Sequence, residues 1–206
     1  MLEIQLQGVS KRFQYEWIFK KLSLTITSGD ALAITGGNGS GKSTLLKCLS
    51  GVIPITSGKI KFKFEGKEID DGDKYKFLSI SAPYLEVPEE FTLSELIQFH
   101  FQFKRPLEGI SANDLLDIIY LKEHQSKQIS QFSSGMKQRL KLGLALFSEV
   151  PLILLDEPTS NLDLNGIKWY QDLIKNYQRG RTLLVCSNDT REYEFCSQKI
   201  ALEDYK

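Results

Sequence analysis

One stretch decides the fold: Gly36-Gly37-Asn38-Gly39-Ser40-Gly41-Lys42-Ser43-Thr44. Its spacing fits the P-loop pattern at every required position. Glycines let successive backbone N–H groups turn inward around a polyphosphate, and the N-terminus of a following helix favours an anion. Lys42 is expected to bind the β- and γ-phosphates, and Ser43 is expected to coordinate Mg²⁺. The stretch therefore predicts a nucleoside triphosphate site with Mg²⁺.

The residues on either side have the pattern that a P-loop needs. Ala31–Thr35 is a short apolar run typical of a buried strand. Thr44–Leu49 carries leucines at helical spacing. An ordinary glycine turn with a solvated lysine is the alternative, and the complete pattern between a strand and a helix disfavours it.

The composition narrows the possible functions. The 206 residues include 26 Lys+Arg and 26 Asp+Glu, so the formal net charge is zero and no nucleic-acid footprint is expected. No apolar run approaches the roughly 20 residues that span a bilayer, and Met1–Gln5 lacks a signal-peptide pattern. Cys48, Cys186 and Cys196 lie far apart, which favours free thiols. We expect a chain of the reducing cytoplasm.

Periodicity predicts strands at both ends of the chain and helices in the middle. The predicted strands are 2–6, 13–19, 21–27, 31–35, 60–64, 152–155, 182–186 and 199–202, with a turn at 65–67 after the fifth. The predicted helices begin at Thr92, at Ser111 (running through Leu121), at Ser133 and at Leu164 (running to Tyr177). Strand, helix, strand order in the last part favours a parallel sheet.

Two acids follow the apolar run Leu152–Leu155. Asp156 would lie at the carboxyl edge of the sheet, where such folds bind ligands. There it is expected to hold Mg²⁺ opposite Ser43, and Glu157 to polarise the water that attacks the γ-phosphorus. Phosphoryl transfer asks the protein mainly to position groups and neutralise charge. Without the P-loop, capping of the loop before Pro158 would explain both acids.

A serine-led segment lies between the P-loop and these acids: Phe132-Ser133-Ser134-Gly135-Met136. The acids are followed by Pro-Thr-Ser-Asn-Leu and Asp163. In this order the motifs resemble the nucleotide-binding subunit of ATP-binding cassette (ABC) transporters over nearly the whole chain. The family segment reads Leu-Ser-Gly-Gly-Gln, so Ser133 and Gly135 match and the other three positions do not. The short length of the chain and the sequence of its P-loop are similar to those of the haem-exporter branch and of small unassigned members.

The resemblance implies an α/β fold with a P-loop NTPase (RecA-like) core. It implies a mainly parallel sheet, an N-terminal antiparallel β subdomain and an α-helical subdomain. Residues 1–206 would form a single ABC ATPase domain. The helical subdomain, about 88–148, would be inserted between a P-loop and antiparallel part (1–87) and an Asp-Glu and C-terminal part (149–206).

The resemblance also implies a head-to-tail homodimer that holds two ATP molecules between its subunits. Ser133 and Gly135 of one copy would face the γ-phosphate on the P-loop of the other, and Asp163 would act across the interface. An aromatic residue near the N-terminus stacks on adenine in the family. Phe13 matches best; Tyr15 and Trp17 are alternatives, and strand packing is the alternative for all three.

Two positions depart from the family. Its glutamine that senses Mg²⁺ and contacts the membrane partner is expected near Ser81–Tyr84, but Ala82 stands there and Glu86 is the nearest acid. Its switch histidine is replaced by Asn188, which can hydrogen-bond a γ-phosphate oxygen but cannot carry a proton. Slow hydrolysis follows as a hypothesis. His100 and His124 are interpreted as surface or packing residues.

The predicted function is the ATPase subunit of an ABC transporter. ATP binding would close the dimer, and hydrolysis through Glu157, with Lys42 and Asn188, would reopen it. A separate membrane permease is then required, and the chain would lie on the inner face of the cell membrane through it. Phe99, Phe101 and Phe103 are candidates for the permease groove, although helix core is the preferred interpretation. The alternatives are a DNA-repair or translation ABC protein and an ATP-gated clamp with little hydrolysis.

Overall fold

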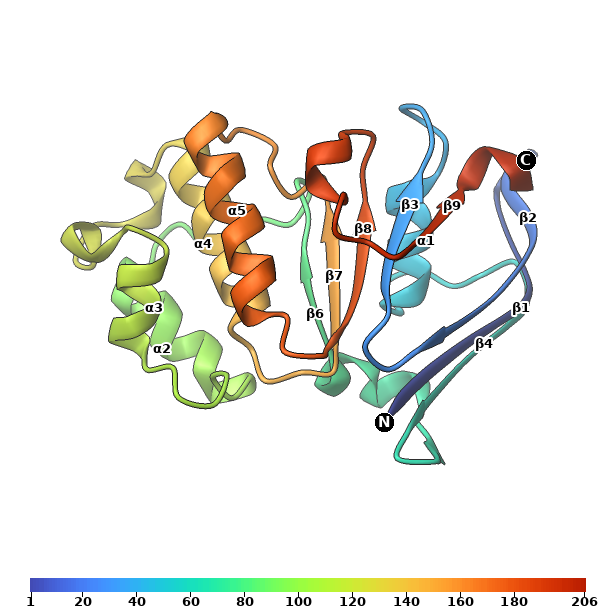
Figure 1. Cartoon of the computed structure of the whole chain (residues 1–206), viewed down its shortest axis with the longest axis horizontal. Coiled ribbons are helices and arrows are strands. Elements are labelled where there is room, and N and C mark those ends of the chain that lie inside the picture. The colour runs from blue at the N-terminus through green and yellow to red at the C-terminus, as the bar shows by residue number, and fades with distance from the viewer.

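The computed structural model describes residues 1–206, which form two sheets and five α-helices (Figure 1). Sheet A is antiparallel with the order β2-β1-β4-β5, and sheet B has the order β6-β7-β8-β3-β9. The strands are β1 (Leu2–Phe13), β2 (Glu16–Thr27), β3 (Ala31–Thr35), β4 (Ser57–Phe64), β5 (Lys67–Glu68), β6 (Leu78–Ser81), β7 (Leu152–Asp156), β8 (Thr182–Cys186) and β9 (Gln198–Ala201). The helices are α1 (Lys42–Leu49), α2 (Leu93–Phe103), α3 (Ala112–Ile118), α4 (Ser134–Leu146) and α5 (Leu164–Tyr177). Short 3₁₀ segments are η1 (Asp71–Phe77), η2 (Lys122–His124), η3 (Ile129–Gln131), η4 (Thr190–Glu192) and η5 (Leu202–Tyr205).

Sheet B is parallel throughout, which makes the sheet more uniform than the mainly parallel one expected. Every residue of β3, β7 and β8 is buried. Parallel strands that are covered on both faces usually have continuous apolar sequences, and these three strands have that composition. The carboxyl ends of β3 and β7 lead directly into the P-loop and the Asp156-Glu157 pair.

Sheet B separates two hydrophobic cores. Helices α4 and α5 cover one face, with α2 and α3 outside them, while α1 and sheet A lie on the other (Figure 1). Alternation along β8 shows the division, because Leu183 and Val185 belong to the helical core, whereas Leu184 and Cys186 belong to the core shared with sheet A. Cys48 joins the same core from α1, so both of these cysteines are buried, as their apolar surroundings predict.

The first hairpin differs from the expected continuous alternation over 13–19. β1 ends at Phe13 and β2 begins at Glu16, and these two residues are paired across a tight turn. Gln14 in that turn has φ +51°, a left-handed conformation that the alternating pattern did not reveal. Phe13, Tyr15 and Trp17 are therefore exposed at the hairpin end and do not pack as interior strand residues.

The helical part departs from the sequence expectations at three points. The helix capped by Ser111 ends at Ile118 and not at Leu121, because Tyr120 has φ +58°. Strand β6 was not predicted, since its serines interrupt the apolar run. The interpretation of Phe99 and Phe103 as helix core is wrong: 42% and 70% of their surfaces are exposed, and their rings contact each other with centroids 5.1 Å apart.

Candidate functional site

The P-loop turns sharply between β3 and α1. Gly36, Gly39 and Gly41 have φ values of +144°, +78° and +106°, which only glycine adopts without strain. A Cβ atom on Gly41 would lie 2.3 Å from Cγ2 of Ile18, so this glycine is also required by the close approach of β2. Residues 36–44 therefore form the tight loop that their composition predicts.

Lys42 already lies inside this loop. Its side chain is buried, and its ammonium donates to the carbonyl oxygens of Gly36 at 2.6 Å and Gly37 at 3.2 Å. Two distant side chains bind the same turn. The Asn188 amide oxygen accepts from the Gly36 N–H at 3.3 Å, and a Glu203 carboxylate oxygen accepts from the Gly37 N–H at 2.6 Å.

One hollow of about 240 Å³ joins the P-loop to the acid that follows Asp156. Its lining consists of Ile18, Asn38, Gly39, Gly41, Lys42, Ser43, Thr44 and Glu157. The exposed side chain of Glu157 thus shares one space with the loop, as the sequence predicts. Ser40 is buried behind it. Phe13 does not line this hollow, whereas Ile18 does.

Asp156 lies at the end of β7 with both carboxylate oxygens buried and without a hydrogen-bond partner. Burial raises the pKa of Asp156, the charge of Glu157 adds to this, and the nearby Ser43 hydroxyl and Lys42 oppose it. An unpartnered buried carboxylate is costly unless something pairs with it. A divalent cation held by Asp156 and Ser43 fits this arrangement.

Magnesium needs few protein ligands here. No cluster of three or more His, Cys, Asp or Glu side chains suited to a metal exists in the chain. Mg²⁺ is usually held by one or two protein oxygens together with phosphates and water, so a single carboxylate beside a serine suffices. Burial, and after it the charge of Asp156, raises the pKa of Tyr84.

The serine-led segment caps α4. Ser133 is the N-cap, and its hydroxyl accepts from the Met136 N–H at 3.2 Å. A Cβ atom on Gly135 would lie 3.2 Å from the carbonyl oxygen of Asn161, so this glycine lets the loop after Glu157 approach the helix. Asp163 similarly caps α5 by accepting from the Gly166 N–H at 2.8 Å.

The structure joins some predicted site residues and separates others. The P-loop, Glu157 and Asn188 converge: Asn188 also donates to the Asn38 side chain at 3.3 Å. Ser133 makes no hydrogen bond to the P-loop of its own chain and remains exposed. The neighbouring Ser134 lines a different hollow with Asn161.

The segment where the family glutamine was expected, Ser81–Tyr84, borders a groove of about 340 Å³ between β6, α2 and α4. Ala82 is fully buried beside it, and its carbonyl oxygen accepts from the Lys141 ammonium at 3.1 Å. Glu86, Lys104 and Lys141 line the groove. Burial lowers the pKa of both lysines, and neither has a carboxylate within ion-pair distance.

Comparison with known sequences identifies the family. The ABC transporter family matches residues 19–160, which contain the P-loop, the serine-led segment and the Asp156-Glu157 pair. The chain belongs to the ABC transporter family as an ATP-binding domain. One relative is the uncharacterized ABC transporter ATP-binding protein YcbN of Bacillus subtilis, 31% identical over 97% of this chain and 66% of its own length.

The ABC ATP-binding domain is also 31% identical to the cytochrome c biogenesis ATP-binding export protein CcmA of Xanthomonas axonopodis pv. citri, over 80% of this chain and 76% of that protein. Equal identities do not single out a transport branch. The fold matches the ATP-binding cassette MJ0796, solved as a dimer bound to ADP and Pi, with a TM-score of 0.81, 24% identity and coverage of 98% and 94%. None of the helices combines the length and the apolar composition that a membrane-spanning segment requires.

Sequence reasoning missed four residues that the structure brings to this region. Ile18 lines the P-loop hollow, Tyr84 is affected by the charge of Asp156, and Glu203 binds the loop backbone. Glu192 binds the loop after Glu157 through Thr159. Of these four residues only Glu192 is buried. None belongs to a motif with fixed spacing, so a single sequence does not separate them from ordinary surface residues.

Proposed function

We propose that this ABC domain is the ATP-hydrolysing subunit of a transporter, working as a head-to-tail homodimer with a separate permease. One observation carries the proposal: the P-loop and Glu157 share one hollow, while the Ser133 hydroxyl bonds only the first turn of α4 and makes no hydrogen bond to the P-loop of its own chain. Each copy then carries one catalytic part, the P-loop with Glu157, and one capping part, the Ser133 end of α4. In a head-to-tail dimer, the capping part of one copy would complete the catalytic part of the other.

The residues of the hollow suit phosphoryl transfer to water. The loop amides and the α1 N-terminus bind the phosphates of ATP, and Lys42 exchanges its carbonyl partners for phosphate oxygens. Glu157 takes a proton from the attacking water. Asn188 donates its amide N–H to a γ-phosphate oxygen. Ser43 and Asp156 would hold Mg²⁺, which neutralises phosphate charge when bound.

The second copy supplies the remaining donors. Ser133, Gly135 and the N-terminus of α4 are accessible and favour an anion. We assign them to the γ-phosphate held by the partner's P-loop, and Asp163 to the contact between the two copies. The partial positive charge at this helix end has no acidic residue in its first turn to neutralise it. Adenine stacking remains assigned to Phe13, which is 48% exposed.

The groove between β6, α2 and α4 suits the permease. Its apolar floor includes Leu78 and Leu144, and Lys104 and Lys141 bring half-buried positive charge without an acidic partner. A membrane-protein segment that carries a carboxylate would supply that partner. Through this contact the subunit would lie peripherally on the inner face of the cell membrane.

Replacement of the catalytic acid tests hydrolysis and dimer formation together. Glu157→Gln keeps the shape but removes the base, so we expect phosphate release to fall by about 100-fold or more. Mg·ATP should then trap a dimer on gel filtration, while Glu149→Gln, an exposed control, should behave as wild type. A Glu157→Gln chain that stays monomeric in saturating Mg·ATP contradicts the proposal. Wild type that forms the dimer without releasing phosphate supports the ATP-gated clamp, which Asn188 favours.

Reconstitution tests the permease. The subunit should be purified with the permease encoded beside its gene, and ATP hydrolysis measured with and without that partner in nanodiscs. Stimulation that Lys141→Glu removes and Lys168→Glu, on the exposed face of α5, retains supports the groove. Co-purification with DNA or ribosomes, and no stimulation by the permease, would instead indicate a non-transport ABC protein.

A further inference from the structure

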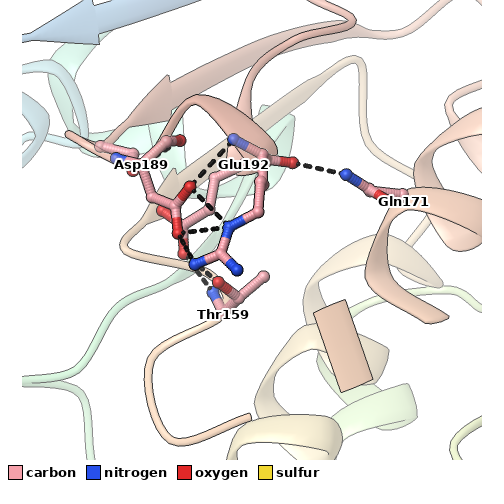
Figure 2. Close-up of polar contacts among 6 residues, drawn as sticks. Thr159, Gln171, Asp189 and Glu192 are labelled. Atoms are coloured by element: carbon pink, nitrogen blue, oxygen red, sulfur yellow. Dashed lines mark hydrogen bonds and ion pairs between the residues drawn. The ribbon is translucent and has the colours of Figure 1, made fainter. Parts of the chain in front are cut away.

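Glu192 is a buried carboxylate that the proposed mechanism does not use. It ends η4 and is 4% exposed. One of its oxygens accepts from the Thr159 N–H at 2.7 Å and from the Thr159 hydroxyl (Figure 2). No cation pairs with it, because the neighbouring Arg191 forms its ion pair with Asp189. Both hydrogen bonds that satisfy this acid therefore come from Thr159.

The segment that carries Glu192 follows Asn188 directly and is firmly attached. Asp189 begins η4 by accepting from the Arg191 N–H at 3.0 Å. The buried hydroxyl of Tyr170 on α5 donates to the Glu192 carbonyl oxygen at 2.9 Å. Gln171, on the same helix, donates to the Arg191 carbonyl oxygen at 2.9 Å (Figure 2). Glu192 thus projects from a segment with a fixed position on α5.

Thr159 lies in the loop between the proposed catalytic acid and Asp163. This loop stores backbone strain, because Glu157 has φ +44° and Asn161 has φ +65°. Such conformations persist only where the surrounding structure holds them. Gln138 of α4 holds the carbonyl oxygen of Pro158 at 2.6 Å, and Glu192 holds the next residue from the opposite side.

We propose that Glu192 is a positioning residue for ATP hydrolysis. By holding Thr159, it joins the segment that carries Asn188 to the loop that carries Glu157 and Asp163. A buried charge is retained only with its hydrogen bonds, so the attachment is specific to the Thr159 N–H and hydroxyl. Displacement of a catalytic group by about 1 Å can cost about 100-fold in rate. We therefore expect loss of this link to lower turnover and to leave ATP binding at the P-loop unchanged.

The inference rests on the proposed hydrolytic function and predicts a defined kinetic pattern. Glu192→Ala frees the loop, so kcat should fall between about 10- and 100-fold while KM for Mg·ATP stays within about twofold. Glu192→Gln keeps one acceptor oxygen and should lose less. Glu194→Ala, an exposed change two residues away whose side chain accepts a hydrogen bond from Gln171, should leave both constants unchanged.

A cycle at Thr159 separates positioning from a loss of folding. Thr159→Val should lower kcat and Thr159→Ser, which keeps the hydroxyl, should restore it. Combining Glu192→Ala with Thr159→Val should cost no more than Glu192→Ala alone, because the alanine change already removes the contact that the valine change removes. Thermal unfolding of each variant is measured in parallel, and the Gln and Ser variants carry the test if Glu192→Ala does not fold.

The outcomes are decisive in both directions. Unchanged kcat in Glu192→Ala, or additive effects at Glu192 and Thr159, overturns the proposal. A wild-type chain that binds Mg·ATP but does not turn it over refutes the hydrolytic function instead. The dimer formed by Glu157→Gln then decides the question: Glu192→Ala added to that background should lower the dimer fraction at saturating Mg·ATP, and an unchanged fraction overturns the role of Glu192.

Discussion

The P-loop end and the α4 end of this ABC domain differ in how much of their chemistry one copy completes. At the P-loop, Lys42, Glu157 and Asn188 come from three different elements and meet around one loop. At the start of α4, the hydroxyl of Ser133 satisfies its own helix and nothing else. In the proposed dimer, the fold prepares the phosphate site by itself, whereas the serine-led end would acquire its function only against the P-loop of the second copy.

Removal of the P-loop ammonium should have the largest effect. Lys42→Ala deletes the only side-chain cation inside the loop, and we expect kcat/KM for ATP hydrolysis to fall by about 1,000-fold. Phosphate release and equilibrium binding of a fluorescent ATP analogue measure the change. Lys168→Ala is the exposed control. A decrease smaller than tenfold would show that the prepared site does not depend on its own lysine.

Loss of the α4 cap should have a smaller effect on turnover, and this effect should arise only in the dimer. Ser133→Ala and Ser111→Ala each delete an N-cap hydroxyl, so each should lower the free energy of unfolding by about 1 kcal/mol. Only Ser133→Ala should also lower turnover, by about tenfold, with ATP binding to the monomer unchanged. Denaturant unfolding and phosphate release compare the two variants. Equal turnover in both would remove the functional distinction between these helix ends.

Replacement of the asparagine beside the P-loop should lower turnover less than loss of the α4 cap does. Asn188→Ala removes hydrogen bonds to Gly36 and Asn38, and one net hydrogen bond of about 1 kcal/mol corresponds to about fivefold in turnover. Asn165→Ala on exposed α5 is the matched control. Phosphate release under saturating Mg·ATP measures the effect, and a variant with full activity would exclude Asn188 from the site.

A histidine outside both ends should affect stability without affecting turnover. His100 Nε2 and the Ser148 hydroxyl form a hydrogen bond of 2.8 Å, and that hydroxyl lies 2.6 Å from the Leu144 carbonyl oxygen. Burial, together with the charge of Lys104, lowers the pKa of His100 to about 4. The neutral form is thus favoured in the folded state, so this contribution is present above pH 6.5 and is lost as the pH falls towards 4.

His100→Gln should flatten that acid dependence by about 2 kcal/mol, a value reduced for partial solvent exposure, and leave turnover at pH 7.5 unchanged. Urea unfolding between pH 4 and 7 measures the slope, with His124→Gln as the control. If His100→Gln instead abolished hydrolysis, His100 would replace the missing switch histidine, contrary to its place on α2.

Local patterns predicted the central part of the fold. Continuous apolar runs revealed β3, β7 and β8, and serine or threonine caps revealed the starts of α2, α3 and α4. The failures were also local. Positive φ at Gln14 and Tyr120 shortened elements without a glycine to indicate it, and serines concealed β6. Propensity does not report a backbone conformation that tertiary contacts impose.

In the candidate site, the division between predicted and missed residues follows a different rule. Residues within motifs were assigned because phosphate chemistry fixes both their type and their spacing, as at Lys42 and Asp156, and their roles stay predictions. Ile18, Glu192 and Glu203 were not predicted, because they come from elements far away in sequence and belong to no pattern. Their contribution exists only after the chain has folded.

The ammonium of Lys42 already rests on two carbonyl oxygens of its own loop. A nucleotide that arrives therefore does not draw a solvated side chain into the protein but takes over a cation that has been desolvated in advance. Much of the entropy that such a side chain would lose on binding was therefore lost during folding.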